Sequence, residues 1–402
     1  MSRHAAILFL SAGQALAQAA FTDVGVLPGA NFSSCFAISG NAQVAVGESG
    51  VIGTPHAFRW TSTGGIQDLG VLPSQPSSSA KGISSNGSVI VGVSGSRAFR
   101  WTLAGGMQDL GLLPNGVSAS AAAVSADGLT VVGSCTTSGT TYAFRWTSAT
   151  GMQNLGLLHS ANFSVAQACN FDGSIITGFS DATPSGPRAF RWTAAGGMVD
   201  IGVMPSGSVS QPYSMSGGGN TIVGSGNGVG GARAFRWTNT GGMVNLGALP
   251  TGVESGARAV SGNAKVIVGY SDTFFGLRAT IWPPAAPVTS ISDFLAVYGA
   301  NLSNWTLLNA NGVSTDGLTV VGTGTGPGGQ RGWVAHLPVL PCDANCDGST
   351  SPPLLNMSDY MCFITRFAAG GSSANCDAST TPPVLNIFDY ICFQTKFAAG
   401  CP

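Results

Sequence analysis

The stretch Ala143-Phe144-Arg145-Trp146-Thr147 occurs five times in this chain. Identical copies begin at Ala57, Ala98, Ala189 and Ala234, and degenerate copies end at Trp282 and Trp333. The tryptophans of the seven copies, at positions 60, 101, 146, 192, 237, 282 and 333, are therefore 41, 45, 46, 45, 45 and 51 residues apart. A nearly fixed period of this length indicates a repeat architecture.

Each repeat contains four strand-like segments separated by turn signals. In the third repeat these segments are 119–125, 129–134, 142–147 and 152–158, and the first turn contains Asp127-Gly128. A second marker confirms the count of seven, because a Val-Gly pair (Thr-Gly once) recurs at Gly47, Gly92, Gly133, Gly178, Gly224, Gly269 and Gly322. Seven units of four short strands predict an all-β fold, a seven-bladed β-propeller. A parallel β-helix is the alternative, but its coils are shorter than these repeats.

The two ends of the repeat region predict how the ring closes. The last repeat stops after its third strand, near Trp333. Residues 21–28, FTDVGVLP, match the fourth strand of other repeats, such as IQDLGVLP at 66–73. We therefore expect the N-terminal strand to complete the last blade, which removes the open sheet edges.

The arginine of the motif lies nine residues before an Asp or Asn in five repeats. In the third-to-fourth-strand hairpin this spacing predicts that Arg59 lies opposite Asp68, with Phe58 and Trp60 on the other face packing between blades. The equivalent pairs are Arg100 and Asp109, Arg145 and Asn154, Arg191 and Asp200, and Arg236 and Asn245. We interpret them as structural cross-strand pairs. The alternative is a ring of arginines that binds an anionic ligand.

The sixth repeat departs from the pattern. Ile281 replaces the arginine, and Pro283 and Pro284 interrupt the hairpin. Apolar residues then follow at helical spacing: Ile291, Phe294, Leu295 and Tyr298. We expect a short inserted helix across one end of the propeller, acting as a plug or, alternatively, as a lid.

Composition and the N-terminus bear on location. Charged residues make up 8% of the chain and the formal net charge is −1, so the sequence lacks the electrostatic signature of a nucleic-acid-binding protein. Residues 1–17 have the form of a secretory signal peptide, with Arg3 and His4, an apolar run and a small-residue site at Ala15-Leu16-Ala17. The alternative is a first strand or buried segment. No later apolar run has the length of a membrane span. We predict a secreted, extracellular protein, free or attached to the cell surface.

Two motifs of the repeat resemble a known family. The stretch A-F-R-W-T, followed by G-M-x-D-L-G-x-L-P and combined with S-x-D-G-x-x-V-V-G, resembles the HAF-repeat family of extracellular bacterial proteins over residues 21–337. The resemblance implies secretion and a repeat fold. It implies no chemistry. The propeller domain is expected to span residues 18–338.

The segment 339–402 has a different composition and an internal repeat of 30 residues. Asn345-Cys346-Asp347 precedes Asp359 in the first half, as Asn375-Cys376-Asp377 precedes Asp389 in the second. Alternating oxygen ligands, a glycine turn and a later carboxylate suit calcium loops. The candidate ligands are Asp343, Asn345, Asp347, Ser349, Asn356 and Asp359, and in the second loop Asn375, Asp377, Asn386 and Asp389.

This tandem resembles a dockerin-type module, in particular a cysteine-rich variety. The resemblance implies a small helical calcium-binding domain that docks to a cohesin-like protein or to a cell-surface component. Five extra residues interrupt the first loop, and Ser373 and Ala378 replace Asp343 and Gly348 in the second, so we expect weaker calcium binding there. The alternative is that disulfides alone hold both loops.

Six of the nine cysteines lie between 342 and 401, which favours disulfides in an exported protein. A disulfide between Cys342 and Cys401 would join the two ends of the module. Cys346 with Cys362 and Cys376 with Cys392 is one of several possible arrangements of the rest. Cys135 and Cys169 fall in neighbouring blades and are predicted to pair, which leaves Cys35 free.

No catalytic motif stands out from the repeats. Asp127, Asp172 and Asp316 lie in turns, and the histidines His56, His159 and His336 have no metal-ligand spacing. The acids outside the repeat pattern are Glu48, Asp181, Glu254, Asp272 and Asp293. Our hypothesis is a non-catalytic binding or display propeller attached through the C-terminal module, with a glycan as a further possible ligand. The alternative is an extracellular polysaccharide hydrolase or lyase that uses two carboxylates such as Glu48 and Glu254 in the channel.

Overall fold

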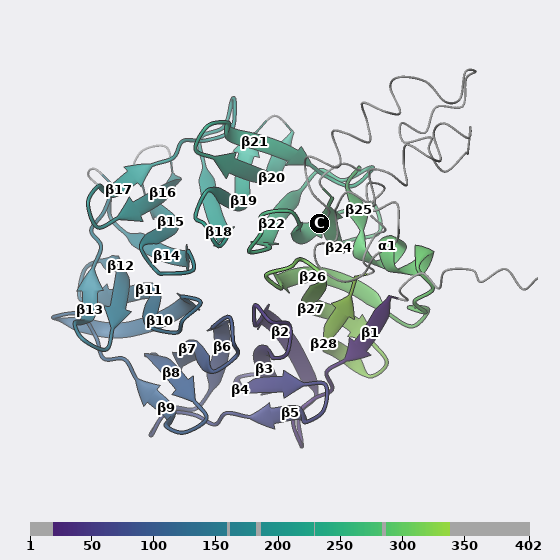
Figure 1. Ribbon diagram of the computed structural model, residues 1–402, viewed down its shortest axis with the longest axis horizontal. Helices are drawn as coiled ribbons and strands as arrows, with labels where there is room; N and C mark the ends of the chain where they lie inside the picture. Colours follow the sequence, from purple (N-terminus) through teal and green to yellow (C-terminus); the bar gives the residue numbers. More distant parts are fainter. Residues whose placement is uncertain (1–18, 159–160, 182–185, 229, 284–286, 338–402) are drawn as a thin grey trace, which may run out of the picture. The chain divides into compact units, whose positions relative to one another are not determined.

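The computed structural model describes residues 19–158, 161–181, 186–228, 230–283 and 287–337. They form seven four-stranded antiparallel sheets arranged as blades in a closed ring (Figure 1). The seven-bladed propeller is thus confirmed. The predicted signal segment 1–17 and the predicted module 339–402, with its candidate calcium ligands and disulfides, lie outside the described residues.

Each blade takes its strands in chain order from the axis outwards. Blade 1 has β2 (Phe32–Ile38), β3 (Ala45–Val51), β4 (Thr54–Thr61) and β5 (Gly65–Asp68); blade 2 has β6 (Ser78–Ile83), β7 (Val89–Ser94), β8 (Arg97–Thr102) and β9 (Gly106–Asp109). Blade 3 has β10 (Gly116–Val124), β11 (Thr130–Thr137), β12 (Thr141–Thr147) and β13 (Gly151–Asn154); blade 4 has β14 (Ser164–Cys169), β15 (Ile175–Asp181), β16 (Pro187–Thr193) and β17 (Gly197–Asp200). Blade 5 has β18 (Ser210–Met215), β19 (Thr221–Gly228), β20 (Gly231–Thr238) and β21 (Gly242–Gly247); blade 6 has β22 (Ser255–Val260), β23 (Ile267–Ser271), β24 (Arg278–Trp282) and β25 (Thr289–Ser290). Blade 7 has β26 (Thr306–Val313), β27 (Thr319–Gly326), β28 (Gly329–His336) and, from the N-terminus, β1 (Ala20–Asp23).

The N-terminal strand closes the ring, as predicted. β1 pairs antiparallel with β28, from Ala20 opposite His336 to Asp23 opposite Trp333. Phe21 adds an edge-to-face contact with Trp305, with ring centroids 4.9 Å apart. The first and last units of the sequence therefore share one blade.

The fourth strands are shorter than predicted because a side-chain turn ends them. Asn154 accepts a hydrogen bond of 2.8 Å from the amide of Gly156, which has φ +87°. This Asx turn and its left-handed glycine recur after Asp23, Asp68, Asp109, Asp200 and Asn245. The Asp/Asn-x-Gly part of the repeat is thus a turn that leads the chain to the next blade.

The predicted Arg–Asp pairs are wrong by one residue of register. Asp68 lies opposite Phe58, and Arg59 lies opposite Gln67. The hairpin loop has three residues, because Gly65 with φ +64° still pairs with Thr61. The same shift separates the other four predicted pairs.

The acids and arginines find other partners. Asp68 pairs with His56 at 2.9 Å, and Asp109 and Asp200 pair with arginines two residues before the motif phenylalanine. Arg100 instead reaches the carbonyl of Gly128 in the next blade, and Arg145 the carbonyl of Gly173. The motif arginines lie on third strands, away from the axis, so they form no ring around it.

The aromatic residues pack between blades, as predicted. Phe58 is fully buried among Cys35, Val321 and Val334 of blades 1 and 7. Four more motif phenylalanines are equally buried: Phe99, Phe144, Phe190 and Phe235. Trp333 pairs with Gly322 as Phe58 pairs with Gly47, so it occupies the phenylalanine position and not the tryptophan position. The tryptophan position of this blade is occupied by Ala335, so the long spacing before Trp333 comes from the insertion in the sixth repeat and not from this shift.

In five of the seven blades a buried serine joins the blade to the preceding one. The Ser78 hydroxyl, at the start of β6, accepts from the amide of Ala57 in blade 1 and donates to the carbonyl of Gly70. Ser33, Ser164, Ser210 and Ser255 make the same two bonds in their blades. In blade 3 the equivalent residue is Ala119. These bonds satisfy backbone groups that the sheets leave unpaired.

The inserted helix of the sixth repeat forms, but it does not lie across the channel. Helix α1 (Ile291–Val297) lies at the outer rim beside β25, where Ile291 and Leu295 are fully buried against blades 6 and 7 (Figure 1). It therefore fills a gap between blades, and the lid alternative is wrong. At seven residues it is far too short to cross a membrane, and it is the only helix within the described ranges.

Cys35, Cys135 and Cys169 are all free thiols, so the predicted Cys135–Cys169 disulfide is absent. Cys135 is buried, and its sulfur accepts from the amide of Leu113 at 3.4 Å. This is the position where other blades have Ser49, Ser94, Ser180 or Ser271 accepting from a leucine amide. Cys135 is thus a substitute for a structural serine.

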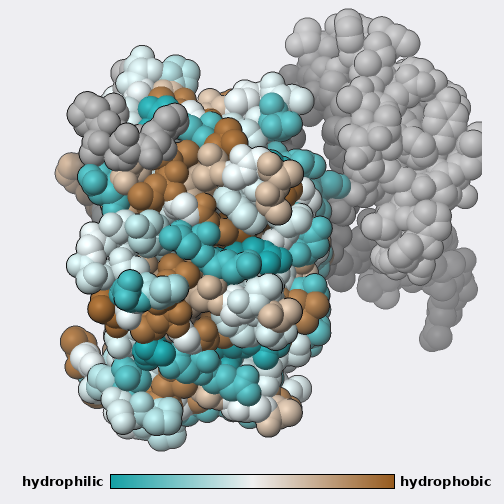
Figure 2. All heavy atoms as spheres, turned by 90° about the vertical axis from the view of Figure 1, so that its left-hand side faces the viewer, coloured by the Kyte–Doolittle hydropathy of each residue, from teal (hydrophilic) through white to brown (hydrophobic). Residues whose placement is uncertain are grey.

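The outer face mixes polar and apolar residues. Figure 2 shows the side formed by blades 3 and 4, where hydrophobic and hydrophilic residues alternate over the surface. This mixture follows from the alternation of side chains along strands.

Candidate binding site in the central channel

The recurring Val-Gly glycine has a steric cause. A Cβ atom at Gly47 would lie 1.8 Å from the carbonyl oxygen of Ser34 on the innermost strand. The other six glycines, at 92, 133, 178, 224, 269 and 322, have the same close contact, at 1.9 to 2.1 Å. The close approach coincides with a β-bulge in the innermost strand, as between Cys35 and Ala37 in blade 1.

The bulge leaves one residue of each innermost strand without a partner in its sheet. These seven residues occupy equivalent positions around the axis: Phe36, Lys81, Ala122, Gln167, Tyr213, Arg258 and Asn311. We call them the channel ring. The innermost strands surround the axis in Figure 1, and each ring residue is half-buried.

Ring residues of adjacent blades contact one another. The Lys81 ammonium lies 4.0 Å from the centroid of the Phe36 ring. The Arg258 guanidinium carbon lies 4.6 Å from the centroid of Tyr213 and 5.1 Å from that of Tyr270 on β23. Each cation therefore stacks on the aromatic ring residue of the preceding blade.

Polar contacts complete the wall of the channel. The Asn311 amide donates to the carbonyl of Cys35 at 2.8 Å, which joins blades 7 and 1. The Tyr213 hydroxyl and the Ser225 hydroxyl are 2.8 Å apart. Asn311 and Tyr213 are thus held in place by their neighbours.

The electrostatics of the wall reflect partial burial. Burial lowers the pKa of Lys81, and the negative charge of Glu48 opposes this. Burial raises the pKa of Tyr270, with a further rise from Tyr213, while Arg258 lowers it. The channel ring therefore has two basic residues, and Glu48 acts electrostatically on one of them, Lys81.

One end of the axis is bounded by a closed belt of backbone hydrogen bonds. The belt joins the seven turns that follow the innermost strands, with N···O distances of 2.9 to 3.2 Å. In order, Asn41 donates to Ser85, Ser85 to Ala126, Ala126 to Phe171, Phe171 to Gly217, Gly217 to Gly262, Asn263 to Thr315, and Thr315 to Gly40. Every blade is thereby linked to the next around the axis.

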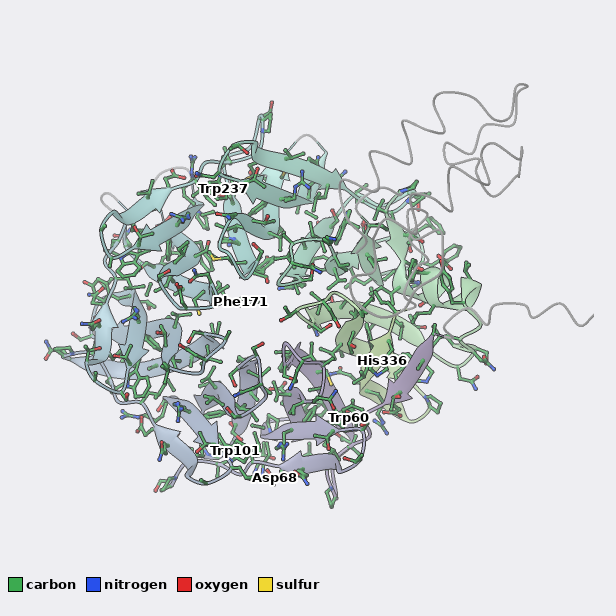
Figure 3. All side chains as sticks on the ribbon, viewed as in Figure 1. Trp60, Asp68, Trp101, Phe171, Trp237 and His336 are labelled. Carbon is green, nitrogen blue, oxygen red and sulfur yellow. The ribbon has the colours of Figure 1, made fainter. Side chains whose placement is uncertain are left out.

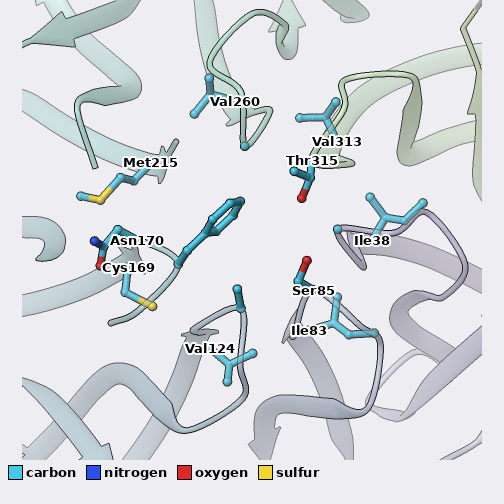
Figure 4. Close-up of a pocket in the computed structure, with 14 residues that line it drawn as sticks. Ile38, Ile83, Ser85, Val124, Cys169, Asn170, Met215, Val260, Val313 and Thr315 are labelled. Carbon is cyan, nitrogen blue, oxygen red and sulfur yellow. The ribbon is translucent and has the colours of Figure 1, made fainter. Parts of the chain in front are cut away.

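Phe171 narrows this end. Its side chain lies near the centre of the ring in Figure 3, and a Cβ atom at Gly217 would lie 2.4 Å from its ring carbons. A Cβ at Gly262 would lie 2.7 Å from the same ring. At the belt is a cavity of about 140 Å³, lined by belt residues such as Ser85 and by residues at the ends of the innermost strands such as Met215 and Val260 (Figure 4).

The acids singled out in the sequence do not form one cluster. Glu48 is on β3 beside the channel, and Glu254 lies in the loop before β22, where it acts on Tyr270. Asp272 accepts from the amides of Val253 and Glu254, and Asp293 belongs to the N-terminal cap of α1. Among the described residues, no three His, Cys, Asp or Glu side chains are grouped as a metal site would require.

The channel ring is what the sequence reasoning missed, although the signal is present. Each ring residue lies three positions before the turn residue that begins the next loop, as Lys81 precedes Ser84 and Arg258 precedes Ser261. Aligning the seven repeats on that turn shows one column with seven different residue types. The aromatic motif identifies positions of the repeat that have the same residue in most copies. The channel ring is a position whose residue differs in every copy, so the motif does not reveal it.

No protein-family model and no curated protein matches the sequence. Solved structures match in fold. An oligogalacturonate lyase from Vibrio parahaemolyticus has a TM-score of 0.56 at 10% identity, over 79% of this chain and 93% of that one. An oligogalacturonate lyase in complex with manganese has a TM-score of 0.54 at 11% identity, over the same shares of the two chains. TolB from Acinetobacter baumannii has a TM-score of 0.40 at 15% identity, and this chain spans about half its length, 51%. At these identities the likeness shows the propeller fold alone.

Proposed function

We propose that the chain is a secreted, non-catalytic binding propeller whose ligand site is the channel, with the C-terminal module attaching it to a partner. The observation that supports the binding site is the contrast between the channel ring and the rest of the repeat. The packing phenylalanines, the turn glycines and the joining serines recur from blade to blade, whereas the ring has seven different residues. Structure accounts for the recurring residues. It does not account for an amine, a guanidinium, two amides and two aromatic rings around one axis.

The side-chain types of the ring suit recognition of a small polar molecule. Binding sites combine apolar and aromatic surface with a few directed polar groups. Phe36 and Tyr213 supply the aromatic surface, and Gln167 and Asn311 supply amides. Because several of these side chains already contact their neighbours, little ordering is needed when a ligand enters.

The experiment that tests the binding site uses the full chain on an array of glycans and small metabolites. We expect at least one ligand to bind, and its binding to be lost in Tyr213→Leu. The matched control is Tyr142→Leu, which changes a tyrosine on the third strand of blade 3, far from the axis. Equal binding by the wild type and Tyr213→Leu would place the ligand elsewhere and contradict the proposal.

The attachment half of the proposal rests on the sequence of residues 339–402. In it, Asp343, Asn345 and Asp347 begin a first calcium loop, and Asp377 begins a second, weaker one. The calcium-loaded module would dock to a cohesin-like protein or to a cell-surface component. Calorimetric titration of the full chain with calcium should show one tight and one weaker ion. The tight one should disappear in Asp347→Asn and remain in Asp316→Asn, which changes an acid of a propeller turn. Absence of any calcium heat would contradict this half alone.

A second candidate function is an extracellular polysaccharide hydrolase or lyase. The observation that favours it is the electrostatic interaction of Glu48 with Lys81, an amine whose pKa is lowered by burial, because burial favours the neutral form that a general base requires. Two structures of similar fold are named oligogalacturonate lyases. Release of reducing or unsaturated sugar ends from acidic polysaccharide, abolished by both Glu48→Gln and Lys81→Gln, would favour the enzyme over the binding protein.

A further inference from the structure

Two cations of the channel ring have no ion-pair partner within the described residues. The ion pairs there are His56–Asp68, Arg97–Asp109 and Arg188–Asp200, all away from the axis. Lys81 and Arg258 instead lie over aromatic rings. A ring face attracts a cation but accepts few of its hydrogen bonds, so most of the N–H donors of both groups remain available.

The two cations belong to innermost strands on opposite sides of the axis. They occupy the same bulge position in blades 2 and 6, so they lie at the same level of the channel. Figure 1 shows β6 and β22 on opposite sides of the axis. A ligand that contacts both cations would therefore have to span the channel at this level.

The charges of the wall decide which ligand fits. Lys81 and Arg258 contribute two positive charges, and Glu48 lies close enough to Lys81 to offset one of them. Glu254, which acts on the neighbouring Tyr270, is exposed in the loop before β22, so solvent screens its effect on Arg258. The positive charge of Arg258 is therefore the less neutralised of the two.

The two sides also differ in hydrogen-bonding character. A guanidinium has a planar fork of donors that matches a carboxylate. The Lys81–Glu48 side offers three donors and a carboxylate acceptor, a combination that suits hydroxyl groups, which both donate and accept. Asn311 and Gln167 add amides at the same level.

We infer that the channel binds a small monocarboxylate with a hydroxylated body, that is, a sugar acid. Arg258 holds the carboxylate, and Lys81 and Glu48 bind hydroxyls on the opposite side. The inference rests on the proposed binding function and names its ligand class. The ligand is a free sugar acid or the terminal acidic sugar of an oligosaccharide, which share this chemistry.

The test is calorimetry on the full chain with glucuronate, glucose and inorganic phosphate as probes. We expect glucuronate to bind, and glucose and phosphate to bind at least about 10-fold more weakly, since glucose lacks the carboxylate and phosphate lacks the hydroxylated body.

The variants test which residues bind each part of the ligand. Arg258→Gln should weaken glucuronate binding by about 10- to 100-fold, and Arg258→Lys should restore part of the loss. Lys81→Gln and Glu48→Gln should each weaken it less. Arg236→Gln, which removes an exposed arginine of blade 5, is the charge-matched control and should have no effect.

Several results would overturn the inference. Equal affinity for glucuronate and glucose would remove the role of the carboxylate, and equal affinity for glucuronate and phosphate would reduce the site to a general anion site. If a neutral ligand binds in a manner that depends on Tyr213 but not on Arg258, the binding function stands and the sugar-acid inference fails. If no ligand responds to any channel variant, both fail. An acidic disaccharide that binds more tightly than glucuronate would identify a chain end as the source; equal or weaker binding would identify the free acid.

Discussion

Gly92 lies directly against the carbonyl of Ser79: a Cβ atom on this glycine would be 2.0 Å from the carbonyl oxygen. The contact accompanies the bulge that leaves Lys81 unpaired on the innermost strand. The Val-Gly marker of the repeat is therefore linked to the channel. It permits the bulge, and the bulge provides one position per blade that is free to vary.

Replacing this glycine tests the link. Gly92→Ala forces the innermost strand away from β7, and we expect a loss of about 2–4 kcal/mol in the free energy of unfolding. Gly139→Ala is the control, since a Cβ there has no neighbour within 4 Å. Denaturant unfolding of both variants measures the difference. Similar stability in the two would show that the close approach is not needed.

Removing the hydroxyl of one of the serines that join neighbouring blades should lower the free energy of unfolding. Ser78→Ala leaves the amide of Ala57 and the carbonyl of Gly70 without their partner, and we expect a loss of about 1–3 kcal/mol. Ser62→Ala, at an exposed turn position of blade 1, should change stability by less than about 0.5 kcal/mol. Unfolding by denaturant compares them. An unchanged Ser78→Ala would mean that water replaces the serine in the blade interface.

The close contact between Gly217 and the Phe171 ring predicts an energetic coupling between substitutions at these two positions. Gly217→Ala alone places a methyl group against the phenylalanine ring and should cost about 1 kcal/mol or more. In a Phe171→Ala background the same change should cost much less, because the three nearest atoms to that Cβ all belong to the Phe171 ring. A double-mutant cycle should therefore give a coupling of about 1 kcal/mol. Additive effects would contradict the packing of Phe171 across the belt.

The partly buried thiol of Cys169 predicts how stability changes in alkali. Burial, with a further rise from Asp127, raises the pKa of Cys169 from 9.0 to about 12. A raised folded pKa stabilises the fold fully below the unfolded value, and this contribution is lost as pH rises from 9.0 towards 12. Between these limits the thiol steepens the loss of stability by about 1.4 kcal/mol per pH unit. Cys169→Ala should remove that part of the slope. Parallel curves for the wild type and the variant would show that the thiol titrates normally.

Much of the fold could be predicted from the sequence because the repeat is dense in local signals. The tryptophan period, the Val-Gly pairs and the likeness of residues 21–28 to a fourth strand were sufficient for seven blades and their closure. The predicted hairpin register was wrong because Gly65, in a left-handed conformation, still pairs with Thr61 and so shortens the loop by one residue. The pattern of the sequence does not distinguish the shorter loop from the longer one. Trp333 was aligned with the motif tryptophans, but it occupies the phenylalanine position of its blade. A tryptophan side chain can fill the space that Phe58 fills in blade 1.

The candidate site was harder to predict because its residues follow no motif. Glu48 was selected as an unrepeated acid, and it does lie beside the channel. Lys81 and Arg258 were not selected, since a bulge changes which residues of a strand point towards the axis and period-two reasoning places them on a sheet face. Only the strand pairing of each blade reveals that the seven residues are equivalent.

The most direct measurement of the central claim, that the channel ring is a ligand site, is an NMR titration of the dimethylated lysines. The chain has three lysines, Lys81, Lys265 and Lys396, so the Lys81 signal can be assigned with Lys81→Arg. With its ammonium 4.0 Å from the Phe36 ring, Lys81 should show an upfield ring-current shift that is lost in Phe36→Leu. That signal, and no other lysine signal, should move when glucuronate is added to the full chain. A Lys81 signal at the position of a free lysine, unaffected by Phe36→Leu and by every ligand tested, would contradict the account.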